Sequence, residues 1–92
     1  MRFILLGHIK DQAKERNIDI KIIEATISNP GQIVPEAKGL KIAQRKYLDK
    51  SKNKEYLIRV VFREEKETRI GITAYLTSKV KKYWRQENEN QI

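Results

Sequence analysis

The residues best suited to hold a phosphate lie in the second half of the chain, on stretches where polar and apolar side chains alternate. Side chains alternate between the two faces of a strand, so Arg59 and Arg63 are expected on one face of a strand. The same rule places Arg69, Thr73 and Tyr75 together on the following strand. Arginine forks bind phosphate oxygens through two hydrogen bonds, and helices are expected to cover only the opposite, apolar face. We therefore predict an uncovered phosphate-binding face; the alternative is an ordinary solvated sheet face.

Two more candidates lie near the start of the chain. Histidine titrates nearer neutral pH than any other side chain, so His8, the single histidine, is the natural general acid or base. Arg16 follows two helical turns later, within reach of the same phosphate. Metal-free cleavage of RNA needs a proton acceptor, a proton donor and cations at the phosphate, roles that His8, Tyr75 and Arg59 would fill. The alternatives are a surface or helix-capping histidine and an arginine in an ion pair.

A third polar strand, Leu40–Leu48, precedes these two. It contributes either Gln44 and Lys46 or Arg45 and Tyr47 to the phosphate-binding face. A register shift of one residue exchanges the two sets, and the sequence does not choose between them. Lys46 or Arg45 is accordingly expected to hold the scissile phosphate together with Arg59.

The charge of the chain is uneven. The 92 residues include 20 Lys and Arg against 12 Asp and Glu, a net charge of +8. Residues 1–37 hold five basic and five acidic residues, whereas residues 38–85 hold fifteen basic and five acidic ones. This asymmetry predicts a polyanionic partner such as RNA, an anionic membrane or an acidic protein. The alternative is charge that serves solubility or ion-pair networks.

Composition excludes several classes of chemistry. The chain has no cysteine and one histidine, so we expect no disulfide, no Cys- or His-rich metal centre and no cofactor. The longest apolar run near the start, Phe3–Leu6, is too short for a signal peptide or a membrane span. We expect one cytoplasmic domain over residues 1–92 with no membrane partner.

The first third of the chain has helical periodicity. Ile9 and Ala13 share a face of a first helix, and Asp19 can cap a second helix that residues 29–31, Asn-Pro-Gly, end. The two helices should form an antiparallel hairpin. Residues 1–6 form either an edge strand or the entry to the first helix.

Strands follow at residues 40–48, 56–63 and 69–76, and Ser78 can cap a last helix in which Tyr83 and Trp84 pack at the core or its edge. The predicted fold is α+β, with an N-terminal helical hairpin, a three- to four-stranded antiparallel sheet and a C-terminal helix.

Several short motifs together form a recognisable pattern. They are His8, Arg16, Asn29–Ile33, Gly39–Gln44, Leu57–Val61, Ile72–Tyr75 and Lys79–Trp84. Over roughly residues 5–84 the chain resembles an uncharacterised family of small domains related to the BrnT and RelE toxins, within the barnase–EndoU–colicin–RelE group of ribonucleases. The resemblance implies a RelE-like fold whose open sheet face acts on RNA, and an antitoxin protein as partner.

The leading hypothesis is a toxin of a type II toxin–antitoxin module that cleaves mRNA, free or on the ribosome, without a metal. The alternatives are a non-catalytic RNA- or ribosome-binding module and a protein-interaction domain. The expected catalytic residues are His8, Arg59, Tyr75 and Lys46. The expected RNA-binding residues are Arg16, Gln44, Arg45, Arg63, Arg69 and Thr73.

Overall fold

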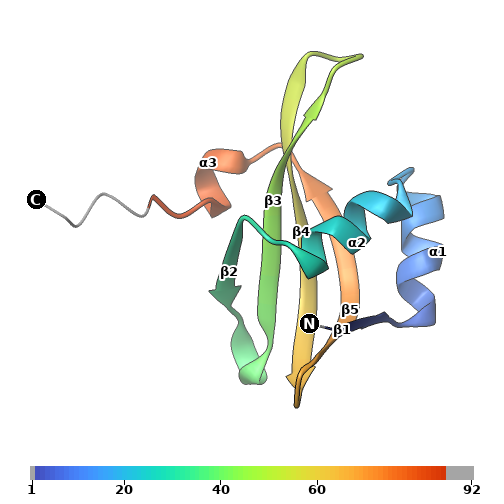
Figure 1. Cartoon of the computed structure of the whole chain (residues 1–92). Coiled ribbons are helices and arrows are strands. Elements are labelled where there is room, and N and C mark those ends of the chain that lie inside the picture. The colour runs from blue at the N-terminus through green and yellow to red at the C-terminus, as the bar shows by residue number, and fades with distance from the viewer. Residues whose placement is uncertain (1, 87–92) are drawn as a thin grey trace, which may run out of the picture.

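The computed structural model describes residues 2–86 and has an α+β architecture with one five-stranded sheet (Figure 1). The elements are β1 (Arg2–Leu5), α1 (Gly7–Glu15), α2 (Ile20–Ser28), β2 (Gln32–Pro35), the 3-10 turn η1 (Ala37–Gly39), β3 (Lys41–Asp49), β4 (Lys54–Glu65), β5 (Thr68–Thr77) and α3 (Val80–Tyr83). The strand order is β1-β5-β4-β3-β2. β1 runs parallel to β5 and the other neighbours are antiparallel, so the sheet is mixed.

The predicted arrangement of a helical hairpin, three or four antiparallel strands and a C-terminal helix is therefore wrong. β1 precedes the helices and pairs in parallel with β5, and β2 adds a fifth strand between the predicted second helix and the predicted strand at residues 40–48. β2 can form beside two prolines because Pro35 lies at its end on a sheet edge, where a missing N–H costs little. The last helix is a single turn, after which the chain continues in an extended conformation at Trp84.

The helices α1 and α2 cover one face of the sheet, the helix side. Asp19 accepts a hydrogen bond from the Lys21 backbone N–H at 2.9 Å and caps α2, as predicted. Ile9 of α1 and Ile23 and Ile27 of α2 are fully buried there. They pack against the sheet residues Ile58, Val60, Phe62 and Ala74. Burial of these branched side chains fixes which face of β4 points to the helices.

A bulge in β5 reverses the alternation of its side chains, so residues before and after the bulge follow opposite patterns of facing the helix side. The register shifts between Val61 and Phe62, so Phe62 pairs with Gly71 and Ile72 is the extra residue. Gly71 consequently points to the helix side, where an added Cβ would lie 2.9 Å from Leu5 Cδ2 and 3.1 Å from Ile9 Cδ1. Strict alternation therefore predicts correctly which face each side chain occupies after the bulge, at residues 73–77, but not before it, at residues 68–71.

The chain after β5 crosses to the face opposite the helices. In Figure 1, α3 and α1 lie on opposite sides of the sheet. No helix within residues 2–86 has the length and apolar character needed to cross a bilayer. The same residues contain no cluster of three His, Asp or Glu side chains placed to hold a metal ion.

Candidate nucleic-acid interface

Arg59 lies at the centre of a row of side chains that crosses three strands. In the sheet register it faces Gln44 of β3 on one side and Tyr75 of β5 on the other. Its Nε donates to Gln44 Oε1 at 3.0 Å, and its Nη1 donates to the Tyr75 hydroxyl at 2.7 Å. Arg59 and Tyr75 thus share one face and touch, as the alternation of β4 and the second half of β5 predicts.

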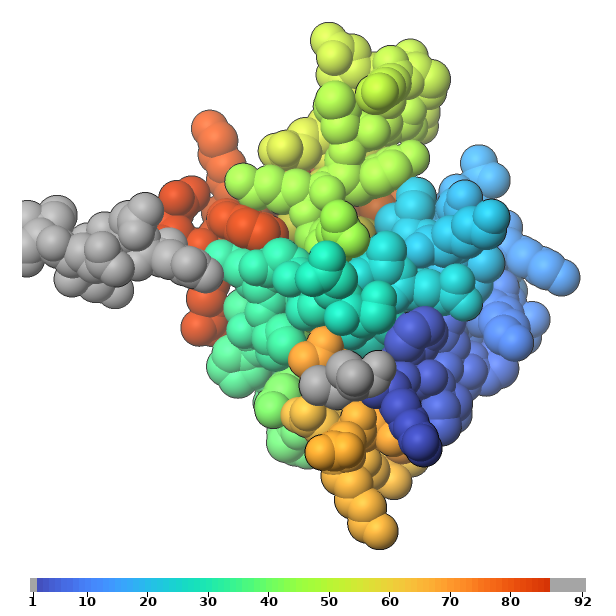
Figure 2. Space-filling model, in the orientation of Figure 1, coloured from blue at the N-terminus to red at the C-terminus, as the bar shows by residue number. Residues whose placement is uncertain are grey.

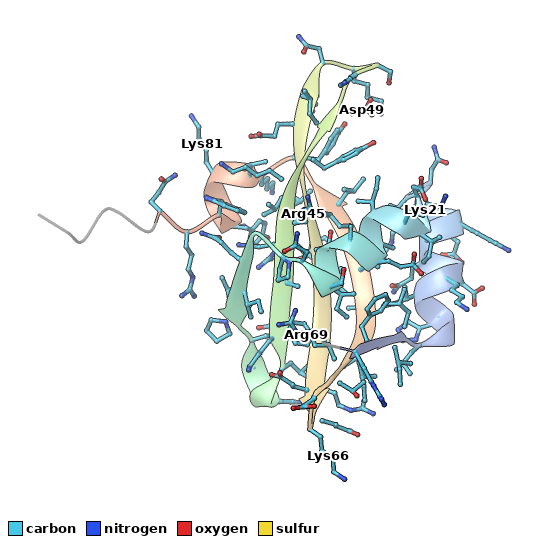
Figure 3. All side chains as sticks on the ribbon, in the orientation of Figure 1. Lys21, Arg45, Asp49, Lys66, Arg69 and Lys81 are labelled. Carbon is cyan, nitrogen blue, oxygen red and sulfur yellow. The ribbon has the colours of Figure 1, made fainter. Side chains whose placement is uncertain are left out.

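The register also decides the question that the sequence leaves open for β3. Gln44 and Lys46 lie opposite Arg59 and Leu57, so they belong to the same face as Arg59. Arg45 lies opposite Ile58 and faces the helix side, where it lines a small hollow with Lys21 of α2. Both residues are labelled in Figure 3. Arg45 is therefore separated from the Arg59 cluster.

The guanidinium of Arg59 is buried without a carboxylate beside it. The residue is 6% exposed, and its Cζ lies 4.1 Å from the centroid of the Tyr83 ring. Within residues 2–86 the salt bridges are Lys41–Glu64 and Arg63–Glu65, so no described acid neutralises Arg59. Its charge is stabilised by dipoles and by an aromatic face, which compensate for lost hydration less completely than a carboxylate does.

The segment of residues 80–86, called the cover below, lies over this row. Gln44 Nε2 donates to the Tyr83 carbonyl at 3.1 Å, and the Arg85 N–H donates to Gln32 Oε1 at 3.1 Å. Gln32 Nε2 donates in turn to the Arg85 carbonyl. The prediction that this face is left uncovered is wrong. The reason is that Gln32 and Gln44, buried in the sheet, supply hydrogen bonds that hold the backbone of the returning chain.

Trp84 closes the edge of the cover. A Cβ on Gly31 would lie 2.9 Å from the far end of the Trp84 indole, so the ring rests on the turn before β2. Lys46 Nζ lies 4.6 Å from the centroid of the same ring. The indole is thus held between the turn and a lysine of β3 by packing and a cation–π contact.

A basic cleft opens beside the cover. It has a volume of about 490 Å³ and lies between α3 and the strands β3 and β4. The lining residues are Lys46, Glu55, Ser78, Lys79, Val80, Lys81, Lys82, Trp84 and Gln86. Four lysines against one glutamate make the cleft strongly positive, and Figure 2 shows the orange-red residues of α3 protruding beside the green strands.

The candidates on α1 have structural roles at the edge of β5. Arg16 Nη1 donates to the Ala74 carbonyl at 2.6 Å, and Gln12 Oε1 accepts bonds from the Ala74 N–H and the Thr73 hydroxyl. These side chains satisfy backbone groups that β1 is too short to pair. His8 is exposed in the first turn of α1, across the sheet from the cover, so the structure does not bring it to Arg59.

Arg63 and Arg69 also lie apart from the Arg59 cluster. Arg63 is exposed, and its Nε donates to Glu65 at 2.8 Å. Arg69 precedes the bulge in β5 and faces the helix side, where its Nη1 donates to the Ile27 carbonyl at the end of α2 at 2.8 Å. The expectation that Arg69 shares the face of Arg59 is therefore wrong, because the extra residue in β5 reverses the alternation.

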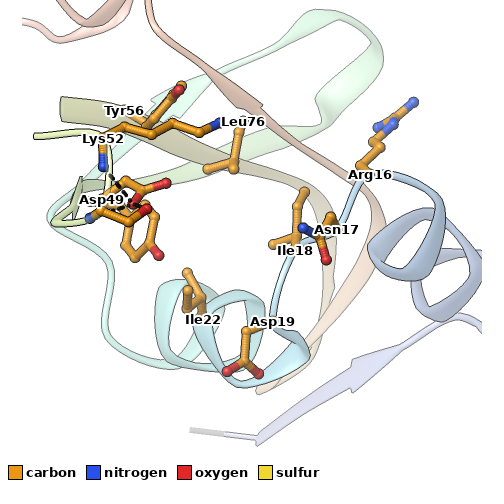
Figure 4. Close-up of a pocket in the computed structure, with 11 residues that line it drawn as sticks. Arg16, Asn17, Ile18, Asp19, Ile22, Asp49, Lys52, Tyr56 and Leu76 are labelled. Carbon is orange, nitrogen blue, oxygen red and sulfur yellow. Dashed lines mark hydrogen bonds between the residues drawn. The ribbon is translucent and has the colours of Figure 1, made fainter. Parts of the chain in front are cut away.

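A second hollow of about 580 Å³ lies between the α1–α2 connection and the β3–β4 hairpin (Figure 4). The carboxylate of Asp49 at its rim accepts hydrogen bonds from the Ser51 hydroxyl at 2.7 Å and from the Ser51 N–H at 3.0 Å. The Ser51 hydroxyl bond is the main reason that the pKa of Asp49 is lowered. Asp49 is thus engaged in closing its own turn.

Gln32, Tyr83 and Trp84 belong to the site although the sequence analysis assigned them no binding role. Gln32 and Gln44 could have been recognised from the sequence, because each is a polar residue among apolar neighbours. When such a side chain is buried, it must find hydrogen-bond partners.

Comparison of the chain with protein-family models, with curated proteins and with solved structures finds no significant match. The interpretation of the site therefore depends on its geometry.

Proposed function

We propose that this protein binds single-stranded RNA in the basic cleft beside α3, with Arg59 as a buried cation behind it. The supporting observation is the composition of the cleft, which Lys46, Lys79, Lys81 and Lys82 line together with the half-buried Trp84. Proteins that bind single strands combine cations for the backbone with aromatic rings for the bases. A cytoplasmic location, where mRNA is found, fits this proposal.

The local charge supports a polyanion as ligand. The stretch Ser78–Gln86 contains Lys79, Lys81, Lys82 and Arg85 and no acidic residue. It lies over Arg59, for which no carboxylate is found among residues 2–86. Positive charges held this close repel one another, and a chain of phosphates would relieve that repulsion. The aromatic ring favours RNA over an acidic protein segment, because bases stack on aromatic rings.

The salt dependence of binding tests this proposal. Each phosphate contact to a single strand contributes about −0.7 to the slope of log affinity against log salt. Contacts from the four lysines of the cleft predict a slope of about −3, and thus roughly a 50-fold loss of affinity between 50 and 200 mM salt.

Matched charge variants locate the contact. The double variant Lys81→Ala/Lys82→Ala should halve the slope and weaken binding of a single-stranded oligonucleotide. The control Lys10→Ala/Lys14→Ala removes two exposed lysines of α1 on the other side of the sheet and should change neither quantity. Equal effects of the two double variants would mean that only net charge matters and would contradict a defined cleft.

A metal-independent endoribonuclease of the RelE/BrnT-like toxin class, controlled by an antitoxin, is the second candidate. The observation that favours it is the 2.7 Å hydrogen bond between Arg59 and the Tyr75 hydroxyl, with Lys46 on the same face. A guanidinium, an ammonium and a phenol are suited to hold a phosphate and to protonate a leaving oxygen. His8 is not part of this second proposal, because α1 lies across the sheet.

Tyr75→Phe separates cleavage from binding. If the protein is a nuclease, the variant should cleave an RNA oligonucleotide at least 100-fold more slowly under conditions in which all of the RNA is bound, as expected for loss of a general acid. Expression without a partner should arrest growth for the wild type only. Undiminished cleavage by the variant would remove Tyr75 from the chemistry.

A further inference from the structure

Arg59 retains hydrogen-bonding capacity that the folded chain does not use. Its Nε and Nη1 donate to Gln44 and Tyr75, whereas Nη2 has no hydrogen-bond partner within residues 2–86. The ring of Tyr83 lies over the guanidinium, with its centroid 4.1 Å from Arg59 Cζ. A largely buried cation with a free donor, and no described acid beside it, is suited to bind an anion.

We propose that Arg59, Gln44 and Tyr75 form a phosphate-binding site that the cover, residues 80–86, closes in the free protein. A phosphate group of the ligand takes the place of Tyr83 when the cover lifts. This inference deepens the proposed function, since it assumes a polyanionic ligand and states how that ligand reaches the buried arginine.

The attachments of the cover suit it to lift without unfolding the sheet. The backbone of the cover is held at Tyr83 and Arg85 by the side-chain amides of Gln44 and Gln32, not by pairing with a strand. Its large side chains Val80, Tyr83 and Trp84 are half-buried and stand outside the core cluster under α1 and α2. Segments with few buried apolar contacts open at low free-energy cost.

The positive charge of the cover favours a polyanion as the ligand that displaces it. Phosphates bound at Lys81 and Lys82 approach Arg59 from above, and the next phosphate along the strand can replace Tyr83. The apparent affinity of such a site is reduced by the fraction of molecules that are closed. Weakening the attachment of the cover must therefore strengthen binding, which is the opposite of what loss of a contact residue does.

Gln32→Ala is the variant that tests this inference. It removes both hydrogen bonds to the backbone of Arg85 and the bond that Gln44 Nε2 donates to Gln32 Oε1, and it removes no hydrogen bond of Arg59 itself. Affinity is measured for tripolyphosphate, a small polyanion, and for a single-stranded RNA oligonucleotide. We expect both ligands to bind Gln32→Ala about tenfold more tightly than the wild type, a gain that corresponds to the loss of one or two ordinary hydrogen bonds from the closed state.

Three further variants keep the result unambiguous. Gln12→Ala is the matched control, because Gln12 also receives two hydrogen bonds, but from Thr73 and Ala74 at the other edge of the sheet. It should give no gain. In the double variant Gln32→Ala/Arg59→Gln the gain should disappear. If Gln32→Ala fails to fold, Gly31→Ala, which displaces the Trp84 indole, should produce the same gain for tripolyphosphate, which has no base to stack on that ring.

The outcomes separate the two proposals. Suppose that RNA binds the wild type but that the variants with a weakened cover bind neither ligand more tightly. The inference that the cover closes a phosphate site is then wrong, while the proposed RNA-binding function stands. If tripolyphosphate binds the variants more tightly in an Arg59-dependent way but RNA does not bind, the inference about the cover is supported and the proposed RNA-binding function fails. A gain that persists in the Arg59→Gln background would also overturn the inference, because Arg59 would then not be the receptor.

Discussion

Replacing Gly31 by alanine should release Trp84 from the sheet while the rest of the fold persists. The added Cβ would lie 2.9 Å from the tip of the indole and 3.3 Å from the Gln44 carbonyl. The Gly31 backbone cannot move away, because its N–H donates to that carbonyl at 2.9 Å. The indole, on a half-buried side chain, must move instead.

The cost of this substitution is limited by what the indole contributes. Overpacking in a rigid core costs about 1–3 kcal/mol. Here the strain is relieved by losing a cation–π contact with Lys46, worth about 0.5–1 kcal/mol at a partly exposed site. We expect a loss of about 1 kcal/mol, which lowers Tm by about 4–8 °C for a domain of this size.

Fluorescence measures the release directly, because Trp84 is the single tryptophan of the chain. Its emission should shift to longer wavelength in the folded variant, and acrylamide should quench it more strongly. Gly7→Ala is the matched control, since a Cβ there meets no atom within 4 Å. Wild-type emission and quenching in a folded Gly31→Ala variant would refute the packing of Trp84 against this turn.

Three further predictions concern the scaffold. Gly71→Ala should cost about 2 kcal/mol and lower Tm by roughly 8–16 °C, because its Cβ would meet side chains of β1, α1 and α2 that pack in or against the core; a change below 2 °C in a thermal melt would contradict the bulge. Arg16→Ala should destabilise the fold by about 1 kcal/mol in urea unfolding, through loss of the bond to Ala74, and leave RNA affinity unchanged; weaker binding would return Arg16 to the interface. The Asp49 carboxyl should titrate below its ordinary pKa by NMR, so its contribution to stability is present at neutral pH and lost as the pH falls through the folded-state pKa. In Ser51→Ala the titration midpoint should rise, and an unchanged midpoint would contradict the assigned hydrogen bond.

Much of the local structure follows from the sequence. The cap at Asp19 and the spacing of Ile23 and Ile27 define α2, and the alternation of β4 places Arg59 on the face opposite Ile58 and Val60. These features depend on neighbours close in the chain, for which periodicity is a sufficient guide.

The features that the sequence analysis missed depend on long-range contacts. The bulge that turns Arg69 to the helix side shifts the register by one residue, and its one local sign was the glycine Gly71 within a strand. The parallel pairing of β1 with β5 joins the two ends of the domain, which no local pattern records. The cover was missed because Tyr83 and Trp84 look like ordinary packing residues until the amides of β2 and β3 are placed beneath them.

A titration of the ¹⁵N-labelled protein with a single-stranded RNA oligonucleotide tests the central claim most directly. The proposed interface predicts that the largest NMR shift changes fall on the Trp84 indole N–H, the Arg59 Nε–H and the amides of Lys81 and Lys82. Signals of α1 and α2 should stay in place. Shift changes confined to the helix side, or none at salt concentrations of 50 mM and below, would contradict RNA binding at this site.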